Sequence, residues 1–241
     1  MHIQLLIRET LFWIGNVMCE VYHNRIESIV GYCRDKTVLD LGCTQHRMMG
    51  KEVSKKNWLH WRIKEVAQDL VGVDYLEDEV DRLNSLGYNI IHGNVEHIDE
   101  VDLPYAHIEV IVCGELIEHL FNPGLFLSNV RKIMHEDTLL ILTTPNVYSL
   151  HRMNLMLDEH YEKEWLNEEH KAWYSFETLK QALEQNDYLE VKWGYYSPPE
   201  KHQSRLSRLK NRIKRRINYM HINQTELEEG LFFVSKINIR Y

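Results

Sequence analysis

The stretch TVLDLGCTQH, residues 37–46, indicates how this chain folds. Its first five residues form a largely apolar run of the length of one buried strand, and Gly42 follows at once. A glycine at the end of a strand lets the backbone turn sharply and approach a ligand without a Cβ in the way. The stretch is therefore typical of a buried strand that ends at a binding site.

The alternation of short apolar runs with longer amphipathic ones continues along the chain. Further strands are expected at residues 70–73, 88–91, 108–113, 138–142, 189–193 and 231–237. Helical spacing is found at residues 58–69, 76–86, 125–134 and 175–186. This order predicts parallel strands joined by helical crossovers. We expect an α/β fold with a doubly wound, mainly parallel sheet of seven strands and helices on both faces.

Composition narrows the class of protein further. The 241 residues are 44% hydrophobic and 27% charged, which excludes a disordered chain and a multi-span membrane protein. The formal net charge of −8 makes nucleic acid an unlikely partner. The four cysteines are widely spaced and form no C-x-x-C pair, which favours free thiols in a reducing cytoplasm.

Two segments flank the predicted sheet. Residues 1–34 have apolar positions at roughly helical spacing, so we expect an N-terminal helical segment packed on a domain spanning residues 35–241, or lying on a membrane surface. Residues 201–216 hold eight Lys and Arg and no acid, within a predicted helical insertion at 200–225. Three interpretations stay open for this basic helix: a solvated helix, a membrane-surface anchor, or a clamp for anionic substrates. The protein is accordingly expected in the cytoplasm, either free or bound peripherally at a membrane.

Polar and small residues follow four of the predicted strands. In open α/β sheets, ligands bind beyond the carboxyl ends of the strands. The residues at these ends are Asp40, Gly42, Cys43 and Thr44, then Asp74 and Tyr75, then Asn94 and Val95, and finally Glu115. A carboxylate such as that of Asp74 can accept hydrogen bonds from ribose hydroxyls, so the pattern indicates a nucleoside site. The chain lacks both the G-x-G-x-x-G fingerprint of dinucleotide sites and the GK[ST] of a P-loop.

The ordered set of motifs at these strand ends resembles that of class I, Rossmann-like S-adenosylmethionine-dependent methyltransferases. The motifs are VLDLGC (Val38–Cys43), GVDY (Gly72–Tyr75), GNVE (Gly93–Glu96), GELIEHLFNPGLFL (Gly114–Leu127) and LTTPN (Leu142–Asn146). The resemblance covers about residues 38–187. It implies a transferase that uses S-adenosylmethionine as its cofactor.

The resemblance also implies roles for individual residues. Asp40, Gly42, Cys43 and Thr44 would surround the methionine part of the cofactor, Asp74 and Tyr75 its ribose, and Asn94 and Val95 its adenine, with Glu115 in a further cofactor loop. Thr44 and His46 depart from the glycines usual in this loop. The sequence GC-x-x-H resembles a bacterial and archaeal branch associated with glycan or small-molecule modification. We therefore expect O-methylation of a sugar, a glycan precursor or another small-molecule hydroxyl.

The acceptor side offers candidates for acid–base chemistry. A hydroxyl acceptor must lose its proton, and a histidine with a near-neutral pKa suits that task. His119 and His170 are the candidates for the general base, and Glu118 is the candidate that orients it. Residues 147–174 are expected to cover the acceptor. A surface or structural role is the alternative for either histidine, because the chain has 14 of them.

Two other functions stay open at this stage. Glu115-x-x-Glu118-His119 with His170 resembles the metal site of small-RNA 3′-terminal 2′-O-methyltransferases, where carboxylates and imidazoles suit a divalent ion. The E-x-x-E-H pattern also occurs in metal-free relatives, so no metal is expected here. The second alternative is a non-catalytic binding module, since the loop at Thr44 and His46 departs from the family pattern.

Overall fold

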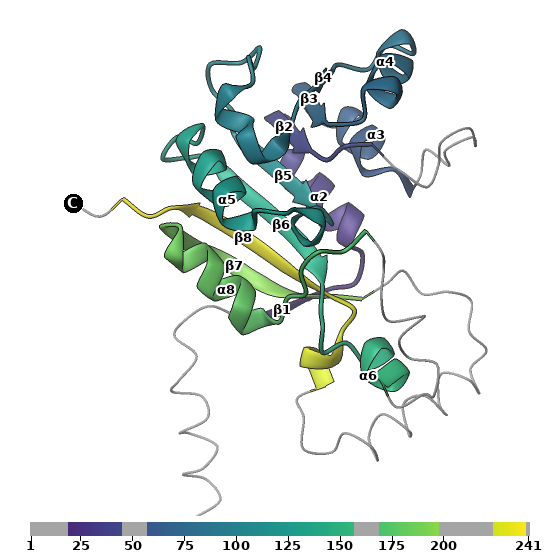
Figure 1. Cartoon of the computed structure of the whole chain (residues 1–241), viewed down its shortest axis with the longest axis vertical. Coiled ribbons are helices and arrows are strands. Elements are labelled where there is room, and N and C mark those ends of the chain that lie inside the picture. The colour runs from purple at the N-terminus through teal and green to yellow at the C-terminus, as the bar shows by residue number, and fades with distance from the viewer. Residues whose placement is uncertain (1–18, 45–56, 157–168, 198–223, 240–241) are drawn as a thin grey trace, which may run out of the picture.

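The computed structural model describes residues 19–44, 57–156, 169–197 and 224–239. Its centre is an eight-stranded sheet in the order β1-β7-β8-β6-β5-β2-β3-β4 (Figure 1). The strands are β1 (Cys19–Tyr22), β2 (Thr37–Leu41), β3 (Asp69–Asp74), β4 (Ile90–His92), β5 (Val110–Gly114), β6 (Leu139–Pro145), β7 (Tyr188–Tyr196) and β8 (Gly230–Ile237). Only β8 runs antiparallel to its neighbours, β6 and β7. The predicted mainly parallel α/β sheet is thus confirmed.

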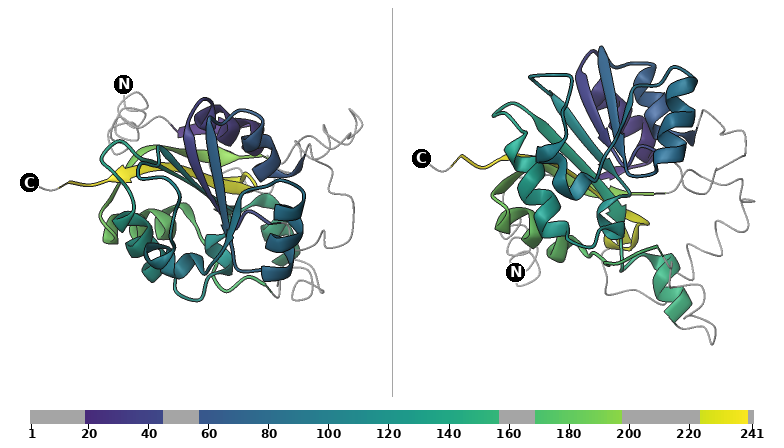
Figure 2. Two further views of the ribbon diagram at one scale, coloured as in Figure 1. Left: turned by 90° about the horizontal axis from the view of Figure 1, so that it is seen from above. Right: turned by 45° about the horizontal axis from the view of Figure 1, so that its top comes forward.

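Helices cover both faces of this sheet (Figure 2). They are α2 (Arg25–Cys33), α3 (Leu59–Lys64), α4 (Glu77–Ser85), α5 (Pro123–Lys132), α6 (Leu150–Met156) and α8 (Phe176–Gln185). Three short 3₁₀ helices are η3 (Val95–Glu100), η4 (Ile117–His119) and η5 (Gln224–Leu227).

The strands divide their side chains between two cores with the period of two that a pleated strand imposes. Leu39 and Leu41 of β2 belong to the core that includes residues of α5 and α8. Val38 belongs to the core on the other face, which includes residues of α2 and α3. Asp40 alternates with Leu39 and Leu41, so it faces α2 and α3. Asp40 therefore shares its face of the sheet with helices α2 and α3.

The N-terminal segment differs from the expectation for residues 1–34. Residues 25–33 are helical, with Asn24 capping α2 by accepting the amide of Glu27, but Cys19–Tyr22 is a strand. It pairs in parallel with the edge of β7, and the ring of Tyr22 stacks on Phe232 at 4.1 Å. The prediction of a purely helical segment is therefore wrong, and the sheet has eight strands instead of seven. Four residues are too few to show a strand period against the helical spacing around them.

Two further helices were expected, at residues 58–69 and within the basic segment 201–216. The helix expected over residues 58–69 ends at Lys64, because the chain must extend from Asp69 to enter β3. The basic segment 201–216 lies outside the described residues, and its helix stays a prediction. Within the described part of the chain, no helix is long and apolar enough to cross a membrane.

The packing of α5 gives a direct test of the core. Phe126 is fully buried, whereas its neighbour Leu125 is 40% exposed. Phe126→Ala is expected to lower the free energy of unfolding by about 3–5 kcal/mol, because the lost ring leaves a cavity. Leu125→Ala should cost less than about 1 kcal/mol. Urea denaturation of both variants checks this, and equal losses would contradict the packing described here.

Candidate functional site

A cavity opens at the carboxyl ends of β2 and β5, where the sequence predicts a cofactor site. Its lining combines residues from both strand ends with residues of α2 and α3: Arg25, Asp40, Gly42, Cys43, Thr44, Asn57, Trp58, Leu59, Gly114 and Glu115. The structure thus brings five of the predicted cofactor residues into one cavity. Arg25, Asn57, Trp58 and Leu59 were not predicted for it.

The conformation of the loop after β2 depends on a glycine with a positive φ and on two hydrogen bonds. Gly42 has φ +69°, and a Cβ there would lie 2.7 Å from the Leu116 side chain. Its amide donates to the Val73 carbonyl at 2.9 Å, which turns the chain back toward β3. The indole of Trp58 donates to the Cys43 carbonyl at 2.8 Å from the other side. A glycine is required here because L residues seldom adopt this backbone conformation.

A buried pair of polar side chains lies below this loop. The Asp40 carboxylate and His60 Nδ1 are 2.9 Å apart, and both side chains are almost fully buried. Burial raises the pKa of Asp40, and the hydrogen bond from His60 opposes that rise. His60 therefore fixes the orientation of the Asp40 carboxylate at the base of the cavity. No local sequence pattern indicates this role, because it depends on how α3 packs against β2.

Segments far apart in the chain meet at the other wall of the cavity. Arg25 of α2 donates from Nη1 to the Thr143 hydroxyl at 3.1 Å, and its guanidinium lies 5.8 Å from the centre of the Tyr196 ring. The Tyr196 hydroxyl donates to Glu115 at 2.7 Å, and Glu115 has φ +59°. Burial, followed by the charge of Glu115, raises the pKa of Tyr196 well above its usual value.

In the part of the chain that the structure describes, the lining of the cavity contains one cationic side chain and two acidic ones. Arg25 is the only cationic side chain among the described residues of the lining, and Asp40 and Glu115 supply two carboxyl groups. The electrostatic influence of Arg25 extends to Asp40, whose pKa it lowers against the larger effect of burial. A zwitterion with a carboxylate and an ammonium group would complement this arrangement.

The remaining predicted cofactor residues lie outside the lining of this cavity. Asp74 is buried and accepts the amides of Thr44 at 2.9 Å and Leu76 at 3.2 Å. Tyr75 beside it is 60% exposed. Asn94 caps η3 by accepting the amide of Glu96, and Val95 belongs to the core. His46 lies outside the described residues.

Glu118, His119 and His170, the three residues predicted for the acceptor side, lie together in the structure. One potential ligand atom of each lies within 4.8 Å of the others, and the two imidazole rings meet edge to face at 4.7 Å. The amides of Lys171 and Ala172 both donate to the Glu118 carbonyl, at 2.7 and 3.1 Å. The backbone therefore fixes His170 against η4, although about fifty residues separate the two in sequence.

The Glu118 side chain is buried and only partly satisfied. Its Oε2 accepts the Thr144 hydroxyl at 2.9 Å, while Oε1 has no hydrogen-bond partner among the described residues. Burial first, and the charge of Glu115 second, raise the pKa of Glu118 to about 8. Its surroundings therefore favour the neutral form of this carboxyl group over the charged form. Glu115 is bonded to Tyr196 instead and is not part of the three-residue cluster.

Comparison with known proteins identifies the fold and its family. Residues 24–191, more than half of the chain, match the family of methyltransferase domains. The chain belongs to this family. A probable S-adenosylmethionine-dependent methyltransferase of Mycolicibacterium smegmatis is 28% identical over 116 residues, which cover 47% of this chain and 40% of that protein. The match thus spans about two fifths of the length of this curated relative.

Solved structures agree with this family. A S-adenosylmethionine-dependent methyltransferase from Archaeoglobus fulgidus is similar with a TM-score of 0.56 at 19% identity, over 88% of this chain and 91% of that one. The plantazolicin methyltransferase BamL, solved with S-adenosylhomocysteine and a triazolic desmethylPZN analogue, is similar with a TM-score of 0.53 at 19% identity. The similarity covers 89% of this chain and 84% of that one. These likenesses establish the shared fold. The resemblance to class I methyltransferases is confirmed, and with it S-adenosylmethionine as the cofactor of the family.

The raised pKa of Glu118 makes the stability of the methyltransferase domain depend on pH. Since the pKa rises from 4.5 to about 8 on folding, the folded state binds more protons than the unfolded state in this interval. The free energy of unfolding should therefore fall as the pH rises from about 5 to about 8. Glu118→Gln should flatten this dependence, because the amide stays neutral.

Urea denaturation at four pH values between 5.5 and 8.5 measures the effect. Exposed Glu136 gives the control, and Glu136→Gln should retain the pH dependence of the original chain. An unchanged dependence in Glu118→Gln would show that this carboxyl group is ionised in the folded protein at neutral pH.

Proposed function

We propose that the chain is a S-adenosylmethionine-dependent methyltransferase that methylates a hydroxyl oxygen of a sugar, a glycan precursor or another small molecule. The observation that carries this proposal is a cavity with charges suited to a zwitterion, together with the paired imidazoles of His119 and His170. The glycan or small-molecule acceptor is supported by the resemblance of the GC-x-x-H loop. Contact of residues 201–216 with an anionic group or a membrane surface stays a prediction.

The amino-acid end of the cofactor fits between the two walls of the cavity. In this proposal Arg25 pairs with the carboxylate of the methionine part, and Asp40 and Glu115 accept its ammonium group. Gly42, Cys43 and Thr44 supply the backbone that the sulfur end approaches. Asp74 and Tyr75 are assigned to the ribose, and Asn94 and Val95 to the adenine.

Methyl transfer is an in-line displacement at a sulfonium, so the protein must mainly align the acceptor oxygen, the methyl group and the sulfur. The acceptor hydroxyl forms a bond to the methyl carbon while the carbon–sulfur bond breaks, and its proton passes to His119 or His170. Burial disfavours the charged form of Glu118, so we assign it the role of a positioning residue. Its carbonyl holds the amides that follow His170, and its carboxyl group accepts the Thr144 hydroxyl.

A second candidate is a metal-dependent methyltransferase acting on the terminal ribose of RNA. The observation that favours it is the cluster of one buried carboxyl group and two imidazoles, a donor set that suits a divalent ion. A bound ion would lower the pKa of a coordinated acceptor hydroxyl. Glu115 stands apart from this cluster, which leaves three protein ligands, and the acidic chain is poorly suited to a polyanion. Removal of divalent ions with EDTA should leave methyl transfer unchanged in the preferred proposal and abolish it in this one.

Calorimetric titration tests the proposed cofactor directly. S-adenosylmethionine and S-adenosylhomocysteine should bind with micromolar dissociation constants, and NAD should not bind. A folded sample that binds neither sulfur nucleoside would favour the non-catalytic binding module.

Loss of the general base should reduce the rate without reducing cofactor affinity. At least one of His119→Ala and His170→Ala is expected to lower kcat about 100-fold or more. Formation of S-adenosylhomocysteine with a panel of sugar and sugar-nucleotide acceptors measures the rate, and calorimetry measures the affinity. His97→Ala, at an exposed position, is the control. Parallel loss of affinity and rate would indicate that the histidine has a structural role.

Arg25 should distinguish ligands that have the amino-acid group from those that lack it. Arg25→Met is expected to weaken S-adenosylhomocysteine binding about 10- to 100-fold, because a charged hydrogen-bonded pair is lost. The affinity for 5′-methylthioadenosine, which lacks the carboxylate and the ammonium group, should not change. Arg62→Met removes a guanidinium from the adjacent helix, where it pairs with Glu27 at 2.8 Å, and should leave both affinities unchanged. Equal weakening of both ligands by Arg25→Met would contradict the proposed contact.

A further inference from the structure

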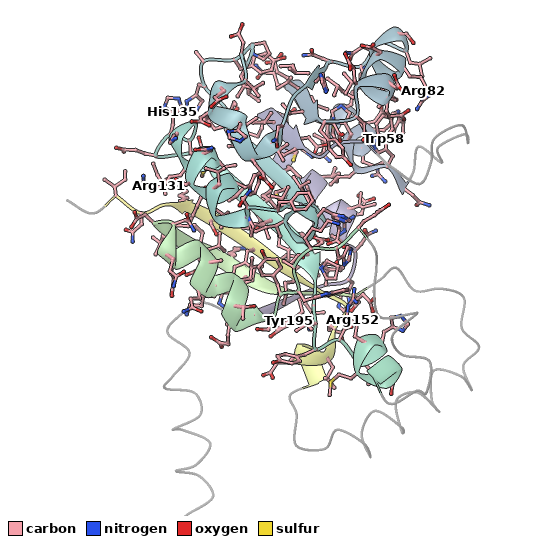
Figure 3. The ribbon with its side chains drawn as sticks, in the orientation of Figure 1. Trp58, Arg82, Arg131, His135, Arg152 and Tyr195 are labelled. Carbon is pink, nitrogen blue, oxygen red and sulfur yellow. The ribbon has the colours of Figure 1, made fainter. Side chains whose placement is uncertain are left out.

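Arg152 is a cationic side chain without a counter-ion in the part of the chain that the structure describes. It lies on α6 and is partly buried, and its Nε is buried with no hydrogen-bond partner among the described residues. Its guanidinium lies over the Trp173 ring, with 4.2 Å between Cζ and the ring centre. Figure 3 places Arg152 between α6 and the ends of the sheet strands.

A row of aromatic rings connects Arg152 with the candidate catalytic residues. Trp173 meets the His170 ring at 4.9 Å, and His170 meets His119 at 4.7 Å. Both Arg152 and Trp173 belong to the segment that the sequence predicts to cover the acceptor. Through Trp173 and His170, Arg152 is therefore linked to the candidate catalytic imidazoles, whereas Arg25 donates to Thr143 at the wall of the cavity.

Acidic side chains act on the charge of Arg152 from a distance, but none of those in the described residues forms an ion pair with it. Burial lowers its pKa, while Glu229, Tyr196, Glu115 and Glu118 oppose this effect without forming an ion pair with it. An arginine stays charged even so. A partly buried charge is costly unless a partner compensates it, and a cation–π contact compensates only a part. The planar guanidinium presents paired donors that match a carboxylate or a phosphate.

We propose that Arg152 and Trp173 form the part of the acceptor site that binds an anionic group, so that the methylated hydroxyl compound carries a carboxylate or a phosphate. Trp173 supplies the apolar surface beside the anion, and the imidazoles of His119 and His170 face the hydroxyl. Uronic acids, sugar phosphates and hydroxy acids are acceptors of this class. The inference rests on the proposed function, because it assigns a substrate class to the same site.

The test compares three ring compounds that differ in their polar group: benzoate, phenyl phosphate and benzyl alcohol. Each is titrated into the full chain saturated with S-adenosylhomocysteine, and binding is measured by NMR saturation transfer and calorimetry. At least one of the anions should bind about 10-fold more tightly than benzyl alcohol. Benzoate and phenyl phosphate separate the two sources of negative charge.

Arg152→Met and Arg152→Gln should reduce this preference to less than about two-fold, because both side chains are neutral. Affinity for benzyl alcohol and for S-adenosylhomocysteine should stay unchanged. Arg131→Met, at an exposed position on α5, is the control and should retain the preference. The melting temperature of Arg152→Met should be unchanged or higher, since an uncompensated charge is removed; a structural arginine would lower it on removal.

The outcomes separate this inference from the proposed function. Anions that bind no more tightly than benzyl alcohol, or a preference that survives in both Arg152 variants, would overturn the inference while leaving the cofactor site intact. Failure of S-adenosylhomocysteine to bind the unmodified chain would instead contradict the proposed function. Anion binding to Arg152 is measured in that case by repeating the titrations without the nucleoside.

Discussion

The parallel pairing of β2 with β5 is the contact on which the site depends. Val38 to Leu41 lie opposite Val110 to Cys113, so both strands end at the same edge of the sheet. Gly42 and Glu115 follow these ends, each with a positive φ that turns the chain away. A Cβ on Gly114 would collide with Leu59 and approach Arg25. The cavity exists because two adjacent parallel strands end together, with a glycine directly after β2 and another as the last residue of β5.

The two ends of the chain complete this edge of the sheet. Strand β1 extends the sheet beyond β7, and the helix that follows it carries Arg25 to the cavity. Strand β8 enters antiparallel between β6 and β7 and holds the last residue of β7, Tyr196, beside Glu115. Gly230 is needed at that point, since any Cβ would overlap the Tyr196 ring. These contacts place the guanidinium of Arg25 at the cavity, where we propose that it pairs with the carboxylate of the cofactor.

The sequence predicts those features that depend on local pattern. Buried strands and the glycine after β2 follow from periodicity and backbone sterics, and Glu118 and His119 follow from their place after β5. Arg25, His60, Tyr196 and Arg152 could not be found in this way, because their environment comes from contacts between distant segments. Asp40 shows the difference: its position at a strand end is readable, whereas its burial against His60 depends on how α3 packs. Strand β1 was missed because it is short and its pairing partner lies about 170 residues further along the chain.

A crystal structure of the chain with S-adenosylhomocysteine tests the central claim most directly. Our account predicts the ligand in the cavity at the ends of β2 and β5, with its carboxylate on Arg25 and its ammonium group near Asp40 and Glu115. The sulfur should point toward His119 and His170. A nucleoside bound at another edge of the sheet, or one whose amino-acid end points away from Arg25, would contradict the account.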